Sequence, residues 1–152
     1  MKRFLRSAPI CAAAAALVLA AAAGCSAAPG TAPFSGYKWR VIEIDHGGKR
    51  TPIPASYAVY LKFAPGGQFG ANDPVNYSSG TYQQGSGGFT TRGIASTAAG
   101  YAGHDPVLLL SVAAISAFGD DVHAAASLAS NQLAVTVGGY LLTCRRDGPA
   151  GP

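Results

Sequence analysis

Apolar and polar residues alternate in short runs from Tyr37 onward, and clusters of glycine, proline, asparagine and aspartate separate these runs. Between Tyr57 and Phe63 every second residue is large and apolar, which predicts a strand with one face in a core. Further short strands are predicted at 67–72, 80–83 and 88–91, each bounded by turn residues. The pattern is typical of a mainly β (α+β) domain, a small antiparallel sheet or barrel.

The first strand of this domain carries an irregularity. Trp39 and Val41 alternate with Lys38 and Arg40, but the alternation slips at Ile42. A bulge or a strand end is therefore predicted near Ile42. Trp39 is interpreted as a core residue, because large aromatic side chains commonly anchor small β cores, with a ligand platform as the alternative.

The last two strands are predicted to form a tight hairpin around Gly138-Gly139, since both central positions of a type I′ turn need positive φ. The turn sets the register and places three facing pairs on one side. These pairs are Val137 with Tyr140, Val135 with Leu142, and Leu133 with Cys144. Cys144 is therefore expected in the core, where apolar surroundings raise the pKa of a thiol and make it unreactive.

One segment lacks the two-residue period. Asp105 is suited to cap a helix and Pro106 to its first turn, and the residues at 107–118 are continuously apolar or small. Gly119 is suited to end the helix. We predict a single helix over 106–117 that is buried on most sides, with a β-strand as the alternative because the segment is rich in valine and leucine.

The N-terminus has the pattern of a secretory signal. Lys2, Arg3 and Arg6 precede an unbroken apolar run over 10–23, which ends in Ala22-Ala23-Gly24-Cys25. This arrangement predicts a signal peptide over 1–24. The apolar run is shorter than the roughly 20 residues that a transmembrane helix needs, so cleavage is favoured over retention.

The end of this signal is similar to a bacterial lipobox, whose cysteine becomes the lipidated first residue of the mature protein. The similarity implies that Cys25 is the lipidation site, carrying palmitate, and that the protein is anchored to the extracytoplasmic face of the cell membrane. Ala22 stands where a lipobox usually has leucine, and residues 21–23 also suit an ordinary A-x-A cleavage site. Simple secretion is therefore the alternative.

Composition divides the rest of the chain. Residues 25–35 are small and rich in proline and glycine, which predicts a lipidated tether before a folded domain at 36–147 and a tail at 148–152.

The signal peptide holds three of the 11 basic residues and none of the 7 acidic ones, so most of the net charge of +4 leaves with it. A nucleic-acid partner, which needs a basic patch, is not expected. With Cys11 removed and Cys25 lipidated, Cys144 has no partner for an intramolecular disulfide.

The order of the predicted elements resembles the META domain, the family of the heat-shock lipoprotein HslJ, over about residues 36–146. The matching points are Gly36-Tyr37-Lys38-Trp39, Phe63, Gly67-Gln68-Phe69-Gly70, Asn72, Gly80-Thr81-Tyr82, Ile94-Ala95-Ser96-Thr97 and Asn131-Gln132-Leu133. Two cysteines that are common in the family are missing, at Ala71 and within 98–101. The resemblance implies an incomplete antiparallel barrel wrapped around one helix, and a role in envelope stress without an agreed chemistry.

Motifs of enzymatic chemistry are missing from the sequence, which has no G-x-S-x-G, no phosphate-binding loop with its lysine, no H-E-x-x-H and no C-x-x-C. Each histidine has an aspartate nearby, in Asp45-His46, in His104-Asp105 and in the pair of Asp121 and His123. All three pairs are predicted in loops or at helix ends, far apart in sequence. A shared metal site is therefore not favoured, and no cofactor is expected.

These observations favour a non-enzymatic, membrane-anchored envelope lipoprotein that binds a protein partner or an apolar ligand. Tyr60, on the polar side of its strand, and Tyr77, in a predicted loop, are candidates for an exposed recognition patch. The alternative is that both tyrosines only cover neighbouring apolar surface. Leu108, Val112 and Ile115 are expected to line an apolar slot between helix and sheet. The alternative functions are a secreted hydrolase that uses an Asp/His pair and a purely structural envelope protein.

Overall fold

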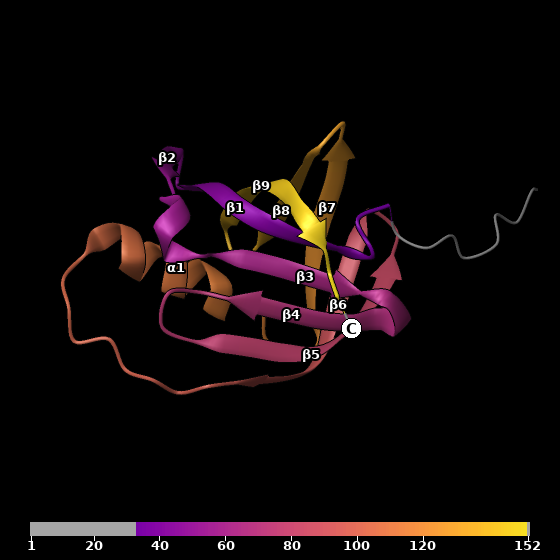
Figure 1. Cartoon of the computed structure of the whole chain (residues 1–152), viewed down its shortest axis with the longest axis horizontal. Helices are drawn as coiled ribbons and strands as arrows, with labels where there is room; N and C mark the ends of the chain where they lie inside the picture. Colours follow the sequence, from indigo (N-terminus) through magenta and orange to yellow (C-terminus); the bar gives the residue numbers. More distant parts are fainter. Residues whose placement is uncertain (1–32, 152) are drawn as a thin grey trace, which may run out of the picture. The chain divides into compact units, whose positions relative to one another are not determined.

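The computed structural model describes residues 33–151, so the predicted signal peptide, Cys25 and most of the predicted tether lie outside the described residues. Nine strands and one α-helix make up this part of the chain (Figure 1). In chain order they are β1 (Tyr37–His46), β2 (Lys49–Pro52), β3 (Tyr60–Ala64), β4 (Gln68–Asn72), β5 (Tyr77–Gly85), β6 (Gly88–Ser96), α1 (Pro106–Ser116), β7 (Val122–Ala129), β8 (Gln132–Val137) and β9 (Tyr140–Pro149). Two short 3-10 turns, Ala55–Tyr57 and Pro65–Gly67, flank β3.

The strands form one antiparallel sheet that closes on itself. From β3 to β9 each strand pairs with the next along the chain, while β1 pairs with β3 on one edge and with β9 on the other. The β1–β9 ladder makes a closed barrel, and β2 is an extra strand on the second half of β1. The predicted fold class, mainly β with one helix, is confirmed. The barrel is closed where an incomplete one was expected, and closure leaves fewer unpaired strand edges.

A bulge is present at Ile42, where a bulge or a strand end was predicted. The register of β1 against β9 shifts between Val41 and Glu43, so that Ile42 is an extra residue in β1. The shift lets both Val41 and Ile44 point into the core, where they are 1% and 0% exposed. In a regular strand, two residues three positions apart point to opposite faces.

The hairpin of β8 and β9 has the predicted register, with Val137 opposite Tyr140 and Leu133 opposite Cys144. Gly138 and Gly139 both have positive φ, at 54° and 83°, as a type I′ turn requires. Cys144 is fully buried and free, and burial raises the pKa of its thiol. The prediction of a buried thiol is therefore confirmed.

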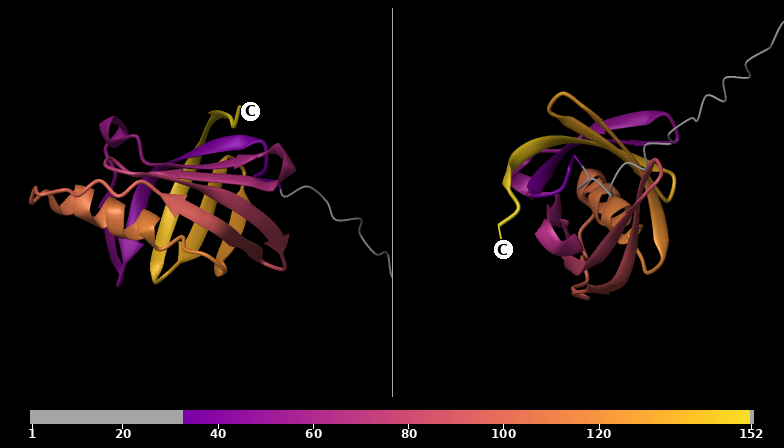
Figure 2. Two further views of the ribbon diagram at one scale, coloured as in Figure 1. Left: turned by 90° about the horizontal axis from the view of Figure 1, so that it is seen from below. Right: turned by 90° about the vertical axis from the view of Figure 1, so that its right-hand side faces the viewer.

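Helix α1 begins where the sequence indicated. The Asp105 carboxylate caps it, with Oδ1 accepting hydrogen bonds from the backbone N–H groups of Val107 at 2.9 Å and Leu108 at 3.1 Å. Figure 2 shows α1 within the ring of strands, seen along the barrel. The expectation that α1 is buried on most sides was wrong, because only Ser111, Ala114 and Ile115 are buried. The helix packs through one face, and its opposite side, with Leu109 44% exposed, faces solvent.

Aromatic rings fill the barrel next to the helix. Phe63 lies at the centre of this cluster, with its ring centroid 4.9 Å from that of Phe89 and 5.6 Å from that of Phe69. Phe118, directly after α1, stacks on Phe89 at 6.3 Å. Phe34 belongs to the same cluster, 4.7 Å from Phe63 and 5% exposed, although its position was expected to be in the tether.

Hydrogen bonds tie residues near both ends of the described part to the barrel. The Trp39 side chain is fully buried, and its Nε1 donates a 2.9 Å hydrogen bond to the Phe34 carbonyl. Strand β9 continues to Pro149, and the Ala150 N–H donates a 2.8 Å hydrogen bond to the Gly36 carbonyl. The folded domain therefore includes Phe34 and extends to Ala150, wider at both ends than the expected 36–147.

Three local expectations differ from the structure. Tyr57 ends a 3-10 turn and Ala58 has a left-handed φ of 52°, so the strand predicted to start at Tyr57 starts at Tyr60. Tyr77 begins β5, where a loop was expected. His46 and His123 lie in β1 and β7, not in loops or at a helix end.

Candidate functional site

The outer face of β3, β4 and β5 carries the polar and small residues of these strands. Successive side chains point to opposite faces of a strand, so the residues between the buried core positions face outward. The register places two rows across the three strands. One row is Lys62, Gly70 and Ser79, and the next is Tyr60, Asn72 and Tyr77.

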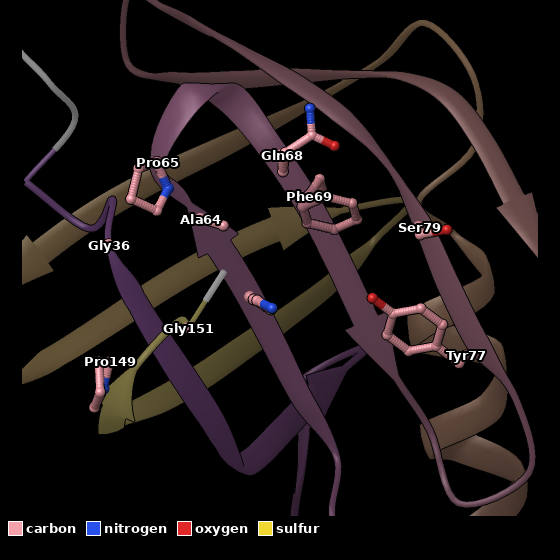
Figure 3. A pocket seen from close by; sticks show the side chains of 10 residues that line it. Gly36, Ala64, Pro65, Gln68, Phe69, Tyr77, Ser79, Pro149 and Gly151 are labelled. Carbon is pink, nitrogen blue, oxygen red and sulfur yellow. The ribbon is translucent and has the colours of Figure 1, made fainter.

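A groove with a volume of about 660 Å³ runs over this face (Figure 3). It brings the outward side of the three strands together with both ends of the folded domain. The lining residues are Gly36, Lys62, Ala64, Pro65, Gln68, Phe69, Tyr77, Ser79, Pro149 and Gly151. Apolar surface from alanine, proline and the tyrosine ring thus lies beside an ammonium, an amide and two hydroxyl groups.

Gly70 makes room for Tyr77 in the groove. A β carbon at Gly70 would lie 2.8 Å from the Tyr77 hydroxyl oxygen and 3.5 Å from Lys62 Cβ. Any larger residue at position 70 would therefore push the tyrosine ring away from β4. Tyr77 remains 40% exposed, with its ring available at the groove wall.

Hydrogen bonds to Thr97, which directly follows β6, hold the backbone of Tyr77 in place. Its N–H donates a 3.0 Å hydrogen bond to the Thr97 hydroxyl, and its carbonyl accepts one of 3.0 Å from the Thr97 N–H. The Asn76 side-chain oxygen accepts bonds from the Thr97 hydroxyl at 3.2 Å and the Ala99 N–H at 2.8 Å. These contacts fix Tyr77 at the start of β5, which is why the expected loop is a strand.

Tyr60, the second predicted recognition residue, is half-buried and lies beside the groove without lining it. Lys38 Nζ lies 5.4 Å from the centroid of its ring, a cation–π contact. Asn72 separates Tyr60 from Tyr77 in the same row. The two tyrosines therefore share one face of the barrel, but only Tyr77 contributes to the groove wall.

The three helix residues predicted to line an apolar slot do not lie in this groove. Ile115 is 1% exposed and packs in the core, while Leu108 and Val112 are half-buried. A smaller cavity of about 250 Å³ does lie against α1, between the helix start and the β1–β2 turn. Its lining is His46, Lys49, Thr51, Pro106, Val107 and Leu110, so none of the three predicted residues belongs to it.

The Asp/His pairs do not converge. Asp45 pairs with Arg50 at 3.6 Å, whereas the His46 ring stacks on Tyr140 with centroids 4.4 Å apart. Asp105 caps α1, and its other carboxylate oxygen accepts the hydroxyl hydrogen of Tyr57. Among the described residues, no group of three or more His, Cys, Asp or Glu side chains is placed to hold a metal ion.

His123 and its aspartate also serve different contacts. The His123 Nδ1 lies 3.5 Å from the Thr90 hydroxyl, across the β6–β7 ladder. The Asp121 carboxylate lies 3.4 Å from Arg92 Nε. The distance between Thr90 Oγ1 and His123 Nδ1 is longer than the roughly 2.6 to 3.2 Å that is usual between a nucleophile and its base.

Comparisons with known proteins find the fold alone. An NMR structure of a protein from Burkholderia xenovorans is similar with a TM-score of 0.57 and 15% sequence identity, covering 75% of this chain and 83% of that chain. A second NMR structure has a TM-score of 0.56 and 20% identity, covering 73% of this chain and 89% of that chain. No model of a known protein family and no curated protein matches the sequence.

Sequence reasoning identified Tyr77 but missed the rest of the groove. Ala64, Pro65 and Gln68 read as strand-end and turn residues, and Pro149 and Gly151 as part of a tail. The available signal was Gly70, a glycine at an outward position inside a strand, which marks a close approach by another group.

Within residues 33–151, no helix is both long and apolar enough to cross a membrane.

Proposed function

We propose that this chain is a non-enzymatic binding module, anchored to the cell membrane through Cys25, whose outer groove holds a segment of an envelope protein partner. The observation that carries the proposal is the groove of about 660 Å³ on the outer face of β3, β4 and β5. Its volume lies within the range of roughly 300 to 1,000 Å³ that is usual for ligand sites. Its open shape and mixed lining suit a peptide segment better than a purely apolar molecule.

An apolar ligand inside the barrel has less support. The rings of Phe63, Phe69, Phe89 and Phe118 pack with centroids 4.9 to 6.3 Å apart, next to the buried Ile115. A ligand between helix and sheet would have to displace side chains from a close-packed interior. The surface groove is open without such a displacement.

The position of the chain ends supports a partner at the membrane. The described part of the chain begins at residue 33, three positions before Gly36 in the groove lining. The nine residues at 25–33 reach at most about 30 Å when fully extended. A lipidated Cys25 would thus keep the groove close to the membrane surface, and the resemblance to the META family adds envelope stress as the setting of this proposal.

Site-specific photo-crosslinking tests the groove. A photoreactive residue at Ser79, inside the groove, should crosslink an envelope protein in intact cells, whereas one at Thr136, on β8, should not. Tyr77→Ala should reduce the Ser79 crosslink at least fivefold, because it removes the ring at the groove wall. Gly70→Ala should weaken it too, since the new β carbon would lie 2.8 Å from the Tyr77 hydroxyl.

Tyr101→Ala is the matched control, because Tyr101 is similarly exposed, at 37%, but does not line the groove. This variant should leave the Ser79 crosslink unchanged. Equal crosslinking from Ser79 and Thr136, or a Tyr77→Ala variant that crosslinks like the unchanged protein, would contradict the proposal.

The anchor is tested separately by metabolic labelling. Cells fed a palmitate analogue should label the protein, and Cys25→Ser should abolish the label and release the protein into the medium. A wild-type protein that carries no label would disprove lipidation at Cys25 while leaving the groove test intact.

A further inference from the structure

Helix α1 turns a mostly apolar face to solvent within the described part of the chain. Its 11 residues include no charged and no amide side chain. A surface helix usually carries polar residues opposite its buried face. The exposed positions of α1 are instead Pro106, Leu109, Ala113 and Ser116, and the Leu109 side chain is 44% exposed.

These four positions form one stripe along the helix, which we call the exposed stripe. Their spacing of three, four and three residues keeps them on one face of an α-helix. Two helices that pack side by side use this spacing at their contact. Leu109 supplies a large apolar side chain, while Ala113 and Ser116 are small and let a second helix approach closely.

An unpaired cation lies near the start of α1. Lys49 lines the small cavity against the helix start, and its exposed side chain makes no ion pair or hydrogen bond within residues 33–151. The acids of this region have other partners. Asp45 lies 3.6 Å from Arg50 Nε, and Asp105 accepts hydrogen bonds through both carboxylate oxygens.

An unpaired carboxylate lies just beyond the end of α1. Asp120 is exposed, and its Oδ1 accepts a 2.6 Å hydrogen bond from the Gly93 N–H, which is a neutral donor. The neighbouring Asp121 lies 3.4 Å from Arg92 Nε, whereas Asp120 has no ion-pair partner in the described part of the chain. The two ends of the exposed stripe therefore carry opposite charges that the domain itself does not neutralise.

Two copies of α1 in antiparallel orientation fit this distribution. Two-fold symmetry places the start of each helix beside the end of the other, so Lys49 of one copy lies near Asp120 of the other at both ends. The partial positive charge of a helix N-terminus also favours a nearby carboxylate. A parallel pair would place like charges together. An anionic bilayer would repel Asp120, so a second copy fits the stripe better than a membrane surface.

We propose that α1 forms the interface of a homodimer in which the exposed stripes of two copies pack antiparallel. The helix is about 16 Å long, so the contact is smaller than the roughly 800 Å² per partner of a standard interface. The expected dissociation constant is therefore on the order of 10 μM. The interface is separate from the groove, whose lining includes no residue of α1.

Disulfide crosslinking of the full chain in intact cells tests the orientation. Two differently tagged chains are co-expressed, one with Leu109→Cys and one with Ala113→Cys, and the cells are treated with a mild oxidant. These positions face each other in an antiparallel pair, because the stripe is centred between them. The mixed disulfide should therefore form at least fivefold more than the disulfide of either variant with itself. Leu141→Cys, on β9 and 37% exposed, is the control and should give no more dimer than the unchanged protein.

Charge reversal tests the complementary ends of the stripe. When introduced into both tagged chains, Lys49→Glu or Asp120→Lys alone should lower the yield of mixed disulfide at least threefold, because each places like charges together. The two changes combined should restore the yield, which damage to the fold could not do. Arg145→Glu, an exposed position on β9, is the matched control and should have no effect. A double variant that stays as low as the single variants would contradict the charge pairing.

A photoreactive residue at Leu109 identifies the occupant of the stripe. A product with the mass of two copies of this chain supports the dimer. An adduct with another protein or with phospholipid instead would overturn the proposal and assign the stripe to that occupant. A mixed disulfide no more abundant than the disulfides of each variant with itself would also overturn the antiparallel dimer. The Ser79 crosslink of the groove is measured separately, so its loss leaves this result intact.

Discussion

Asp105 connects two parts of the chain through its two carboxylate oxygens. One caps α1, and the other accepts the hydrogen bond of Tyr57, 48 positions earlier in the sequence. The bond from Tyr57, aided by the Leu108 amide, lowers the pKa of Asp105. The same bond raises the pKa of the Tyr57 hydroxyl, with smaller contributions from desolvation and from the negative charge of Asp105.

These shifts predict how stability depends on pH. The lowered pKa of Asp105 gives stability that is present above about pH 4, its value in the unfolded chain, and is lost as the pH falls through the folded value. The raised pKa of Tyr57 gives stability that is present below about pH 10 and is lost as the pH rises through the folded value. Tyr57→Phe should therefore be less stable than the unchanged protein at neutral pH, and the gap should narrow at both extremes.

Urea unfolding at a series of pH values measures this difference. Tyr77→Phe, which removes the hydroxyl of an exposed tyrosine on the barrel face, is the control and should follow the unchanged protein throughout. If the Tyr57→Phe and wild-type curves run parallel from acid to alkaline pH, the bond to Asp105 does not carry the expected pH dependence.

At the scale of elements, the β8–β9 hairpin and α1 meet at one glycine. Gly138 has a φ of 54°, and a β carbon there would lie 2.8 Å from Ala117 Cβ, directly after the helix. Gly139 has a φ of 83° and open space around it. The first glycine is therefore required for packing as well as for the turn, whereas the second is required for the turn alone.

Asparagine substitutions separate these two requirements, because asparagine tolerates positive φ. Gly139→Asn should cost less than about 1 kcal/mol, within the range of a tolerated turn residue. Gly138→Asn should cost about 1 to 3 kcal/mol more, since it forces a side chain against the helix end. Chemical denaturation of both variants measures the difference, and equal midpoints would show that Ala117 yields without cost.

For the whole molecule, the two ends of the domain complete the barrel. Phe34 supplies a ring to the aromatic cluster, and the Gly36 carbonyl accepts a hydrogen bond from Ala150 beside the β1–β9 ladder. The β1–β9 ladder pairs residues as far apart in the sequence as Tyr37 and Pro149. The barrel therefore cannot close until nearly the whole domain has been synthesised.

Phe34→Ala tests whether the segment before β1 is part of the core. The variant should lose about 3 to 5 kcal/mol of unfolding free energy, the usual cost of removing a buried phenylalanine side chain. Phe34→Leu, which keeps most of the volume, should lose less than about 1.5 kcal/mol. A loss below about 1 kcal/mol for Phe34→Ala in urea unfolding would place Phe34 in the tether after all.

Local features of this protein were determined by the sequence alone. The β8–β9 register, the bulge at Ile42 and the cap at Asp105 each depend on residues within a few positions of one another, and all three were predicted. Local backbone geometry and side-chain alternation are enough to specify such features.

The closed barrel, the core position of Phe34 and the groove were decided by the tertiary structure. Each needs strands that are distant in the chain, such as β1 and β9, to lie side by side. The physical reason is that alternation along one strand fixes which face a residue occupies, while only pairing between strands fixes its neighbours.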